Sequence, residues 1–450
     1  MIESVLFFSI FLFGIYFTNK SIINSYCLTL LSYLIISYDV GLGLNLFGVN
    51  YVISCSRTYL LAFVLTYLFK KISTANKNQY LKSNTDRLLL FLLIYVFLSL
   101  FWGISLAYDL KNFFSERWLL GIGAYFISKD LFRTKESIII LLKYLFLSLM
   151  ILATYGIIEL FTSTPLMQLP FFRSFVFLDT SFESSVYQPH RMLGYRGGLL
   201  RIEGTFWNSI IYSIALTFLY PLYLVMRKFD VKYLKMGFIP VTIVAILTMG
   251  RTAWFSIILA LFFNFNKNKL LTILAICCLF FIAIPYFNEN IETKSELDQS
   301  IFSINSRIYT LPIIYELPIN MLLYGNGIGS YFYAVINDKY MPYSKLCGDN
   351  SLLQIIYTIG VIGAGIFLFF FGSYYLYLLK TQRKYLKNSF EYNLIKGTRI
   401  MLIIQMILFV MTNSIVQDTR LLYVFFSFLG ALGGYLQSNS NHSIGRTLNR

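Results

Sequence analysis

Residues 138–161 of the chain read IIILLKYLFLSLMILATYGIIELF, an apolar run of twenty-four residues. A second run, RLLLFLLIYVFLSLFWGISLA, occupies residues 87–107. Both are apolar on every face and reach the length of about 20 residues that a helix needs to cross a bilayer. A transmembrane β-barrel would instead show alternating segments of about ten residues. These stretches predict an all-α polytopic membrane protein.

The composition of the whole chain agrees with this class. Of 450 residues, 57% are hydrophobic and 18% aromatic, and only 13% are charged. So few charged side chains cannot cover the surface of a water-soluble protein of this size. The composition therefore excludes a soluble globular protein.

The apolar runs predict about 13 transmembrane helices, with a range of 12–14. We expect them at residues 3–19, 22–40, 51–69, 87–107, 113–128, 137–161, 206–226, 236–250, 252–266, 270–287, 351–379, 400–417 and 421–436. The chain then divides into transmembrane segments 1–161, 206–287 and 351–436, two long loops at 162–205 and 288–350, and a tail at 437–450.

The basic residues fix the expected orientation. Alternate loops and helix ends carry 24 Lys and Arg against 5 acids, a net charge of +19, whereas the other side has −3. Cytoplasmic loops of membrane proteins carry the excess of bases. This places the N-terminus outside, the C-terminus inside and both long loops outside. The excess of bases reflects topology and anionic lipid, not nucleic-acid binding.

Several of the few bases on the outer side need an explanation. Arg196 and Arg201 belong to the first long loop, and Arg251 lies between two apolar spans. An Arg near the membrane centre costs about 2.5 to 3.5 kcal/mol, so a partner is expected. The planar guanidinium suits phosphate oxygens, which makes a lipid-linked diphosphate one candidate. The alternative is that Arg251 reaches the interface or pairs with an acid.

Residues 247–254, LTMGRTAW, resemble the Thr-x-Ser-Arg-x-x-Trp signature of the O-antigen ligase and polymerase family, with Gly250 in place of Ser. Upstream, residues 201–208 (RIEGTFWN) are similar to the family's Arg-x-x-Gly-Thr-Phe-x-Asn element. Downstream, Arg307 and then residues 324–332 (YGNGIGSYF) are similar to its glycine-rich outer loop. These motifs follow the family's order over roughly residues 200–370.

The last motif is Asp349-Asn350, followed nine residues later by GVIG at 360–363. It resembles the ligase pattern, with Asp349 where the ligases have His. A carboxylate there can accept the proton of an acceptor sugar hydroxyl. Asp349 therefore favours the polymerase branch. The alternative is that Asp349 only caps a helix beginning near Ser351, since Asp is a preferred N-cap residue.

The resemblance implies a fold similar to GT-C-type membrane glycosyltransferases and a Wzy-type polysaccharide polymerase of O-antigen or capsule, in the bacterial cytoplasmic membrane. The implied catalytic residues are Asp349, Arg251 and Arg307. Substrate contacts are expected from Arg196, Arg201, Asn350, Gly325, Gly327 and Tyr324. The expected partners are an undecaprenyl-diphosphate-linked oligosaccharide, membrane lipid and a chain-length regulator.

Two alternatives stay open: an O-antigen ligase with another acceptor, and a flippase for lipid-linked oligosaccharides. A flippase has no evident need for an outer loop of this size that ends in an acid. The outer loops contain no Asp-x-Asp motif and the chain has only two His, so we expect no metal and no other cofactor.

Overall fold

The computed structural model describes most of the expected helical segments. Its described residues are 2–36, 41–46, 49–73, 83–114, 117–164, 195–196, 199–200, 202, 204–206, 209–227, 229, 234–248, 250–264, 318–330, 350–411, 415 and 418–448. The predicted helix 270–287 and most of both long loops lie outside them.

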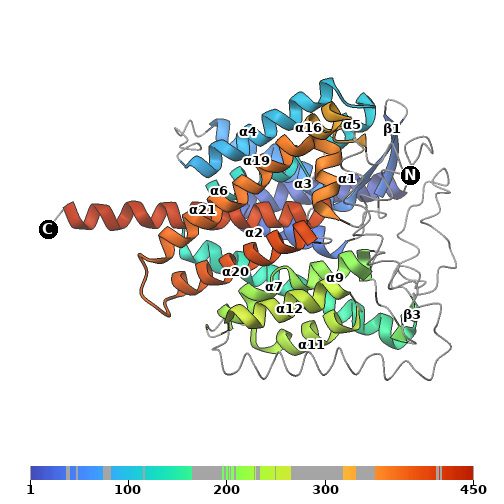
Figure 1. Ribbon diagram of the computed structural model, residues 1–450. Coiled ribbons are helices and arrows are strands. Elements are labelled where there is room, and N and C mark those ends of the chain that lie inside the picture. Colours follow the sequence, from blue (N-terminus) through green and yellow to red (C-terminus); the bar gives the residue numbers. More distant parts are fainter. Residues whose placement is uncertain are drawn as a thin grey trace.

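The described part of the chain is predominantly helical (Figure 1). The first group of helices is α1 (Ile2–Lys20), α2 (Ile22–Ile35), α3 (Cys55–Ser73), α4 (Asn84–Leu98), η1 (Ser99–Phe101), α5 (Leu106–Phe113), α6 (Leu119–Leu131) and α7 (Lys135–Thr162). The second is η3 (Gly204–Phe206), α9 (Ser209–Thr217), α10 (Tyr220–Met226), α11 (Leu234–Leu247), α12 (Arg251–Asn264), α16 (Ile319–Tyr324), α19 (Ser351–Gln382), α20 (Phe390–Met411) and α21 (Thr419–Leu448).

Six stretches of the described residues are long and apolar enough to cross a membrane. They are Asn84–Phe101, Lys135–Thr162, Ser209–Met226, Ser351–Gln382, Phe390–Val410 and Thr419–Asn439. Three shorter apolar helices accompany them, Val5–Lys20, Ile22–Ile35 and Thr252–Asn264. Their apolar character indicates a protein embedded in a membrane.

Two small antiparallel hairpins interrupt the helices. The first pairs β1 (Gly41–Leu46) with β2 (Val49–Ser54), and the second pairs β3 (Tyr195–Arg196) with β4 (Leu199–Leu200). The predicted helix 51–69 was therefore wrong at its start, because α3 begins only at Cys55. Gly and Asn in β1 disfavour a helix, and the Val, Tyr and Ile of β2 favour extended backbone.

Other predicted boundaries also differ. The span 22–40 ends at Ile35, and the span 206–226 consists of η3, α9 and α10. The span 87–107 ends at Phe101, because Gly103 and Ser105 lie in non-helical backbone before α5. The span 113–128 is replaced by α6, which begins at Leu119. The span 400–417 begins ten residues earlier as α20, because Glu391, Asn393 and Lys396 make its first turns too polar to read as apolar.

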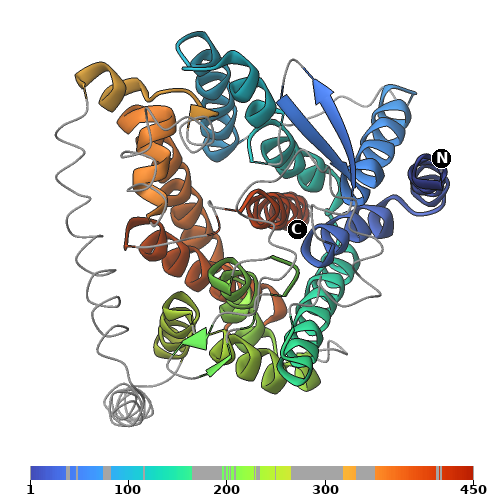
Figure 2. The same cartoon turned by 90° about the vertical axis from the view of Figure 1, so that its right-hand side faces the viewer.

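Helix α21 is the centre of the bundle. Figure 2 looks along its axis and shows the other helices arranged around it. It packs most extensively against α6. At this crossing Gly430 lies against the carbonyl group of Tyr125 and Gly434 against that of Lys129. Small residues four apart allow two helix backbones to approach closely.

Substituting Gly430 with Ala should lower the stability of the folded protein, because the new methyl group would collide with the backbone of α6. Overpacking of this kind costs about 1–3 kcal/mol. The matched control is Gly123→Ala on α6, where a methyl group meets open space. Thermal unfolding of the purified protein measures both. Equal unfolding temperatures for the two variants would contradict the close packing of α21 against α6.

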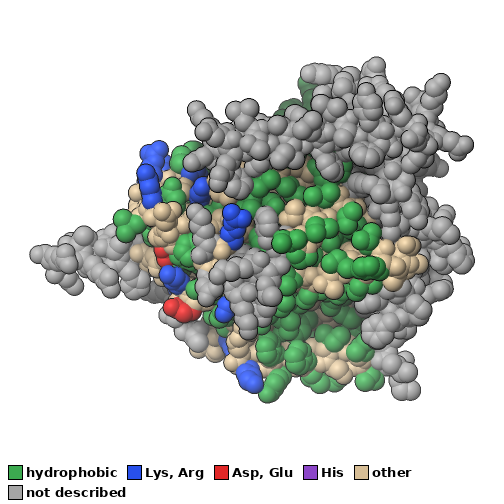
Figure 3. Space-filling model, turned by 90° about the horizontal axis from the view of Figure 1, so that it is seen from below, with side chains coloured by type: hydrophobic (Ala, Val, Ile, Leu, Met, Phe, Trp, Pro, Cys, Tyr) green, Lys and Arg blue, Asp and Glu red, His purple; other side chains and the backbone are tan. Residues whose placement is uncertain are grey.

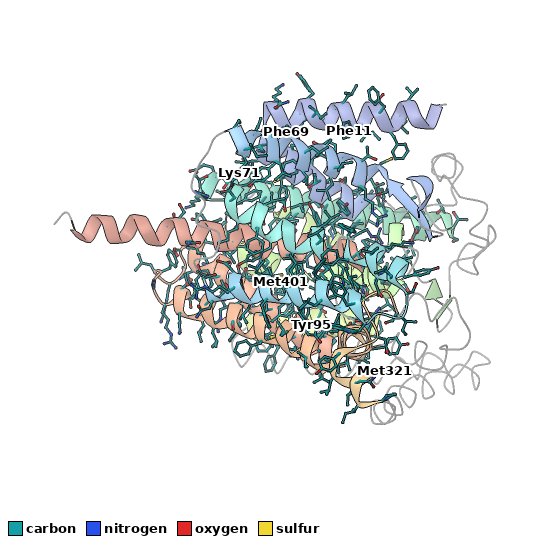
Figure 4. All side chains as sticks on the ribbon, turned by 90° about the horizontal axis from the view of Figure 1, so that it is seen from above. Phe11, Phe69, Lys71, Tyr95, Met321 and Met401 are labelled. Carbon is teal, nitrogen blue, oxygen red and sulfur yellow. The ribbon has the colours of Figure 1, made fainter. Side chains whose placement is uncertain are left out.

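One end of the bundle, which we call the basic end, joins many helix termini through charged side chains. Figure 3 shows Lys and Arg gathered towards this end, and hydrophobic side chains over the middle of the same face. In Figure 4, Lys71 lies towards the basic end and Met321 towards the opposite end. The contacts are Lys71–Asp130, Arg133–Asp130, Lys129–Asp86 (2.5 Å), Lys135–Glu391 (3.9 Å) and Lys396–Asn264 (3.4 Å). They connect helix ends that the charge asymmetry assigns to one side.

Candidate functional site at the opposite end

Helix α19 is broken at Gly360, close to the end of the bundle opposite the basic end. Gly360 has φ 71° and ψ 176°, a conformation that only Gly adopts readily. We call residues 351–359 the short half of α19. Figures 1 and 2 show the orange ribbon of α19 turning sharply beside α16. The predicted helix 351–379 is therefore two helical pieces, not one.

The break removes the helical hydrogen-bond partners of several carbonyl groups, and a neighbouring loop replaces them. Residues 325–330 form this glycine loop. The backbone N–H of Asn326 donates to the carbonyl of Tyr357 (3.0 Å), and that of Gly327 donates to the carbonyl of Thr358 (3.1 Å). The side-chain amide of Asn326 also donates to Tyr357 (3.2 Å). The glycine loop thus completes the end of the short half of α19.

Two aromatic side chains of the first helical group also meet this region. The hydroxyl of Tyr95 on α4 donates to the carbonyl of Ile359 (3.1 Å). The indole N–H of Trp102 donates to the carbonyl of Tyr324 (3.1 Å), and the two rings meet edge to face at 6.1 Å. The Tyr324 side chain remains 47% exposed. It is therefore accessible for the substrate contact that the sequence predicts.

The approach of the loop to the broken helix requires glycine at two positions. Gly325 has φ 81°, and a side chain there would lie 2.6 Å from the backbone nitrogens of Ile359 and Gly360. Gly327 has φ 96°, and a side chain there would meet the Cα of Gly103 at 2.5 Å. Both glycines therefore allow the loop to pack closely against neighbouring backbone.

A buried carboxylate, Asp109 on α5, holds the far side of the glycine loop. Its side chain is 0% exposed, and its Oδ1 accepts the backbone N–H of Gly329 at 2.5 Å. Its Oδ2 has no hydrogen-bond partner among the described residues. Gly103 and Gly327 flank the carboxylate, and a side chain on either would collide with it. Burial raises the pKa of Asp109 to about 6, although the hydrogen bond from Gly329 acts to lower it.

This raised pKa predicts how stability depends on pH. The folded protein binds a proton at Asp109 that the unfolded chain, with a carboxyl pKa of 3.8, has already released. Asp109 therefore stabilises the fold most below about pH 4, and this contribution is lost as the pH rises through about 6. Thermal unfolding measured at several pH values should show this loss. Asp109→Asn should remove that part of the pH dependence. If the stability of this variant depended on pH as the wild type does, Asp109 would not have the raised pKa.

A second group of contacts lies at the start of α19. Asn350 is the N-cap of this helix, and its Oδ1 accepts the backbone N–H groups of Leu352 (2.9 Å) and Leu353 (3.2 Å). Its side-chain amide donates to the carbonyl of Val410 on α20 (3.1 Å). The capping role considered for Asp349 is thus filled by the following residue. The short half of α19 is fixed at α20 by its first end and at the glycine loop by its last.

The start of α12 lies at the same level of the bundle. Helices α12 and α20 pack against each other, and Asn264 meets Lys396 at the basic end. From there both helices run towards the opposite end, α12 backwards to Arg251 and α20 forwards to Val410. At 1.5 Å per residue each distance is about 20 Å. Arg251 and the Asn350–Val410 contact therefore lie at one end of the bundle and at similar depth.

The Gly-Thr-Phe element predicted from the sequence forms η3 at this end. Glu159, in the last turn of α7, is 0% exposed and accepts the backbone N–H of Gly204 at 2.9 Å. The guanidinium of Arg420 lies 3.9 Å above the ring of Phe206 and pairs with Asp418 at 3.0 Å. A buried cation thus holds the segment that leads into α9.

The predicted site residues fall into three groups. Tyr324, Gly325 and Gly327 lie at the break in α19, Asn350 contacts Val410 at the end of α20, and Arg251 begins α12 at a similar depth. Arg196 belongs to β3. Asp349, Arg307 and Arg201 lie outside the described residues. No protein-family model matches the chain, and neither does any curated protein.

Sequence reasoning missed five buried charged residues at this end: Asp109, Arg117, Glu159, Asp418 and Arg420. Each is a charged residue within or beside an apolar segment, far from the basic loops. A charged residue in an apolar segment is a signal that the sequence does contain, because such a residue needs a partner within the protein. Within the described part of the chain, no group of three or more His, Cys, Asp or Glu could hold a metal ion.

Proposed function

We propose that this chain is a polysaccharide polymerase of the cytoplasmic membrane of a bacterium, acting at the outer face. The basic end faces the cytoplasm, the N-terminus lies outside and the C-terminus inside, with about 13 spans in a fold similar to GT-C-type glycosyltransferases. The enzyme joins undecaprenyl-diphosphate-linked repeat units of O-antigen or capsule. A chain-length regulator and membrane lipid are its proposed partners.

The observation that carries this proposal is the common location of two motifs that are a hundred residues apart. Arg251 begins α12 at a depth similar to that of the contact between Asn350, the neighbour of Asp349, and Val410 of α20. A guanidinium suits a diphosphate and a carboxylate suits a sugar hydroxyl. Their joint location away from the basic end supports chemistry at one membrane surface.

The proposed reaction is a single displacement at the anomeric carbon of the donor glycan. A hydroxyl oxygen of the acceptor repeat unit forms the new glycosidic bond while the bond from the anomeric carbon to the diphosphate oxygen breaks. Asp349 accepts the hydroxyl proton, and undecaprenyl diphosphate leaves with the bonding electrons. Arg251 and Arg307 stabilise its charge. Arg196, Arg201, Asn350, Tyr324 and the backbone at Gly325 and Gly327 contact the two glycans.

A broken membrane helix is also a feature of transporters, in which free carbonyl groups line the substrate path. Here the glycine loop and Tyr95 occupy the carbonyl groups of Tyr357, Thr358 and Ile359. The break therefore serves to receive a loop, which favours an enzyme over a flippase. An O-antigen ligase would use the same site with a different acceptor.

Deleting the gene and separating the surface glycan on a gel tests the proposal. A polymerase predicts single repeat units on the final acceptor and no ladder of longer chains. Loss of the whole glycan from that acceptor, with polymer left on the lipid carrier, would identify a ligase. Accumulation of the lipid-linked repeat unit on the inner leaflet would identify a flippase. An unchanged ladder would refute all three.

Reporter fusions test the orientation on which the proposal depends. Fusions after Lys77, Lys232 and Lys387 should report the cytoplasm, and fusions after Arg191 and Asn326 should report the outside, because the bases lie on alternate loops. The activity of alkaline phosphatase and the fluorescence of a cytoplasmic reporter measure the two sides. A cytoplasmic signal at Asn326 would rule out both the orientation and an outer-face site.

A further inference from the structure

The buried carboxylate of Asp109 belongs to none of the motifs in the proposed reaction, yet it contacts one of them. We propose that Asp109 is a positioning residue: by binding the glycine loop it fixes the direction of the short half of α19, at whose start Asp349 lies. This inference rests on the proposed function. A residue of α5, more than two hundred residues away in sequence, would thus affect the geometry of the proposed site.

The first step is the fit between Asp109 and the loop. The carboxylate is fully buried, accepts the N–H of Gly329 at 2.5 Å, and occupies the space left by two glycines. A second hydrogen bond joins the same two segments: the N–H of Ile104, next to Gly103, donates to the carbonyl of Asn326 in the loop (3.0 Å). The segment 103–109 therefore binds the glycine loop through contacts separate from those that the loop makes with α19.

The second step is the path from the loop to the proposed base. Asn326 and Gly327 supply hydrogen bonds to the last turn of the short half, and Asn350 ties its first residue to α20. Because Gly360 ends the regular helix, these hydrogen bonds at its two ends help to fix the direction of the short half. Loosening the loop would let the helix pivot about Asn350. The direction of the first turn of the short half, next to the proposed base in the sequence, would then no longer be fixed.

The third step concerns the charge of Asp109: within the described part of the chain, burial and backbone hydrogen bonds set its pKa, and no cation contributes to it. Burial, and then the positive charge of Arg57 on α3, lower the pKa of Lys111, which also lies on α5. The glycine loop itself has no charged residue. The N–H of Gly329 is thus the partner that the glycine loop gives the carboxylate.

Hydrogen–deuterium exchange of the purified full-length protein tests the structural half of this inference. In Asp109→Ala the amides of residues 325–330 and 351–359 should exchange about tenfold faster or more, since a charged acceptor has been lost. Asp109→Asn keeps an acceptor oxygen and should exchange as the wild type does. Asn326→Ala, which removes a bond to Tyr357, should also speed exchange in the short half. Gly365→Ala, which meets open space, is the control.

The glycan ladder of the same variants tests the functional half. Asp109→Ala and Asn326→Ala should shorten or remove the ladder at normal membrane abundance, and Asp109→Asn should restore it. Unchanged exchange in both Asp109→Ala and Asn326→Ala would overturn the inference, as would faster exchange with a full ladder. A full ladder after deletion of the whole gene would instead refute the proposed function, whatever the exchange data show.

Discussion

Replacing Asp349 with Asn should abolish glycan polymerisation and leave the protein folded. Asn cannot accept a proton, and loss of a general base typically lowers a rate by about 100-fold or more. The cap of α19 is Asn350, so neither Asp349→Asn nor Asp349→Ala removes the capping bonds to Leu352 and Leu353. We expect single repeat units without a ladder from both variants, measured on glycan gels beside protein abundance.

The matched control is the neighbouring residue. Asn350→Ala should lower the free energy of unfolding by about 0.5–2 kcal/mol through loss of the cap. Asn350→Asp keeps the cap but loses the hydrogen bond to Val410, so it should retain only part of that stability. Asp349→His tests the ligase-like residue, which can also accept a proton and should retain part of the activity. A full ladder from Asp349→Asn would remove Asp349 from the site.

The second large effect is expected at Arg251. Arg251→Lys retains the charge but loses the planar pair of donors that grips a diphosphate. Complete loss of such a donor costs about 100- to 1000-fold in rate, so the charge-preserving change should cost about 10- to 100-fold. Arg307→Lys should behave in the same way. The length and amount of polymer in cells, with quantified membrane protein, measure the effect.

A charge-preserving change at the basic end serves as the control. Arg383 is exposed in the connection after α19, so Arg383→Lys should leave the ladder unchanged. Normal long-chain polymer from both Arg251→Lys and Arg307→Lys would mean that these arginines serve membrane insertion or folding and do not bind the diphosphate.

The apolar spans were predictable because hydrophobicity acts locally along the chain. Helix α7 spans Lys135–Thr162, close to the predicted 137–161, since a capping box of Thr134 and Ser137 starts it at the edge of the apolar run. The break in α19 was not predictable from that pattern. Gly360 lies within an apolar run, and only the hydrogen bonds from a distant loop make the broken form stable.

The site was predictable only in its motifs. The positions of Arg251, Gly325 and Asn350 could be marked from their spacing, but their partners are tertiary contacts. Asp109 illustrates the limit: its sequence neighbours suggest an ordinary loop acid between two spans. Its role follows from the glycine loop, more than two hundred residues later, which only the folded chain brings against it.

The central claim is that this chain alone lengthens a lipid-linked glycan. The most direct measurement is the product of the purified protein reconstituted in vesicles with undecaprenyl-diphosphate-linked repeat units from its own host as the only substrate. A ladder of lipid-linked dimers, trimers and longer chains, absent with Asp349→Asn, is the predicted result. Movement of intact repeat units across the vesicle membrane without any lengthening would contradict it.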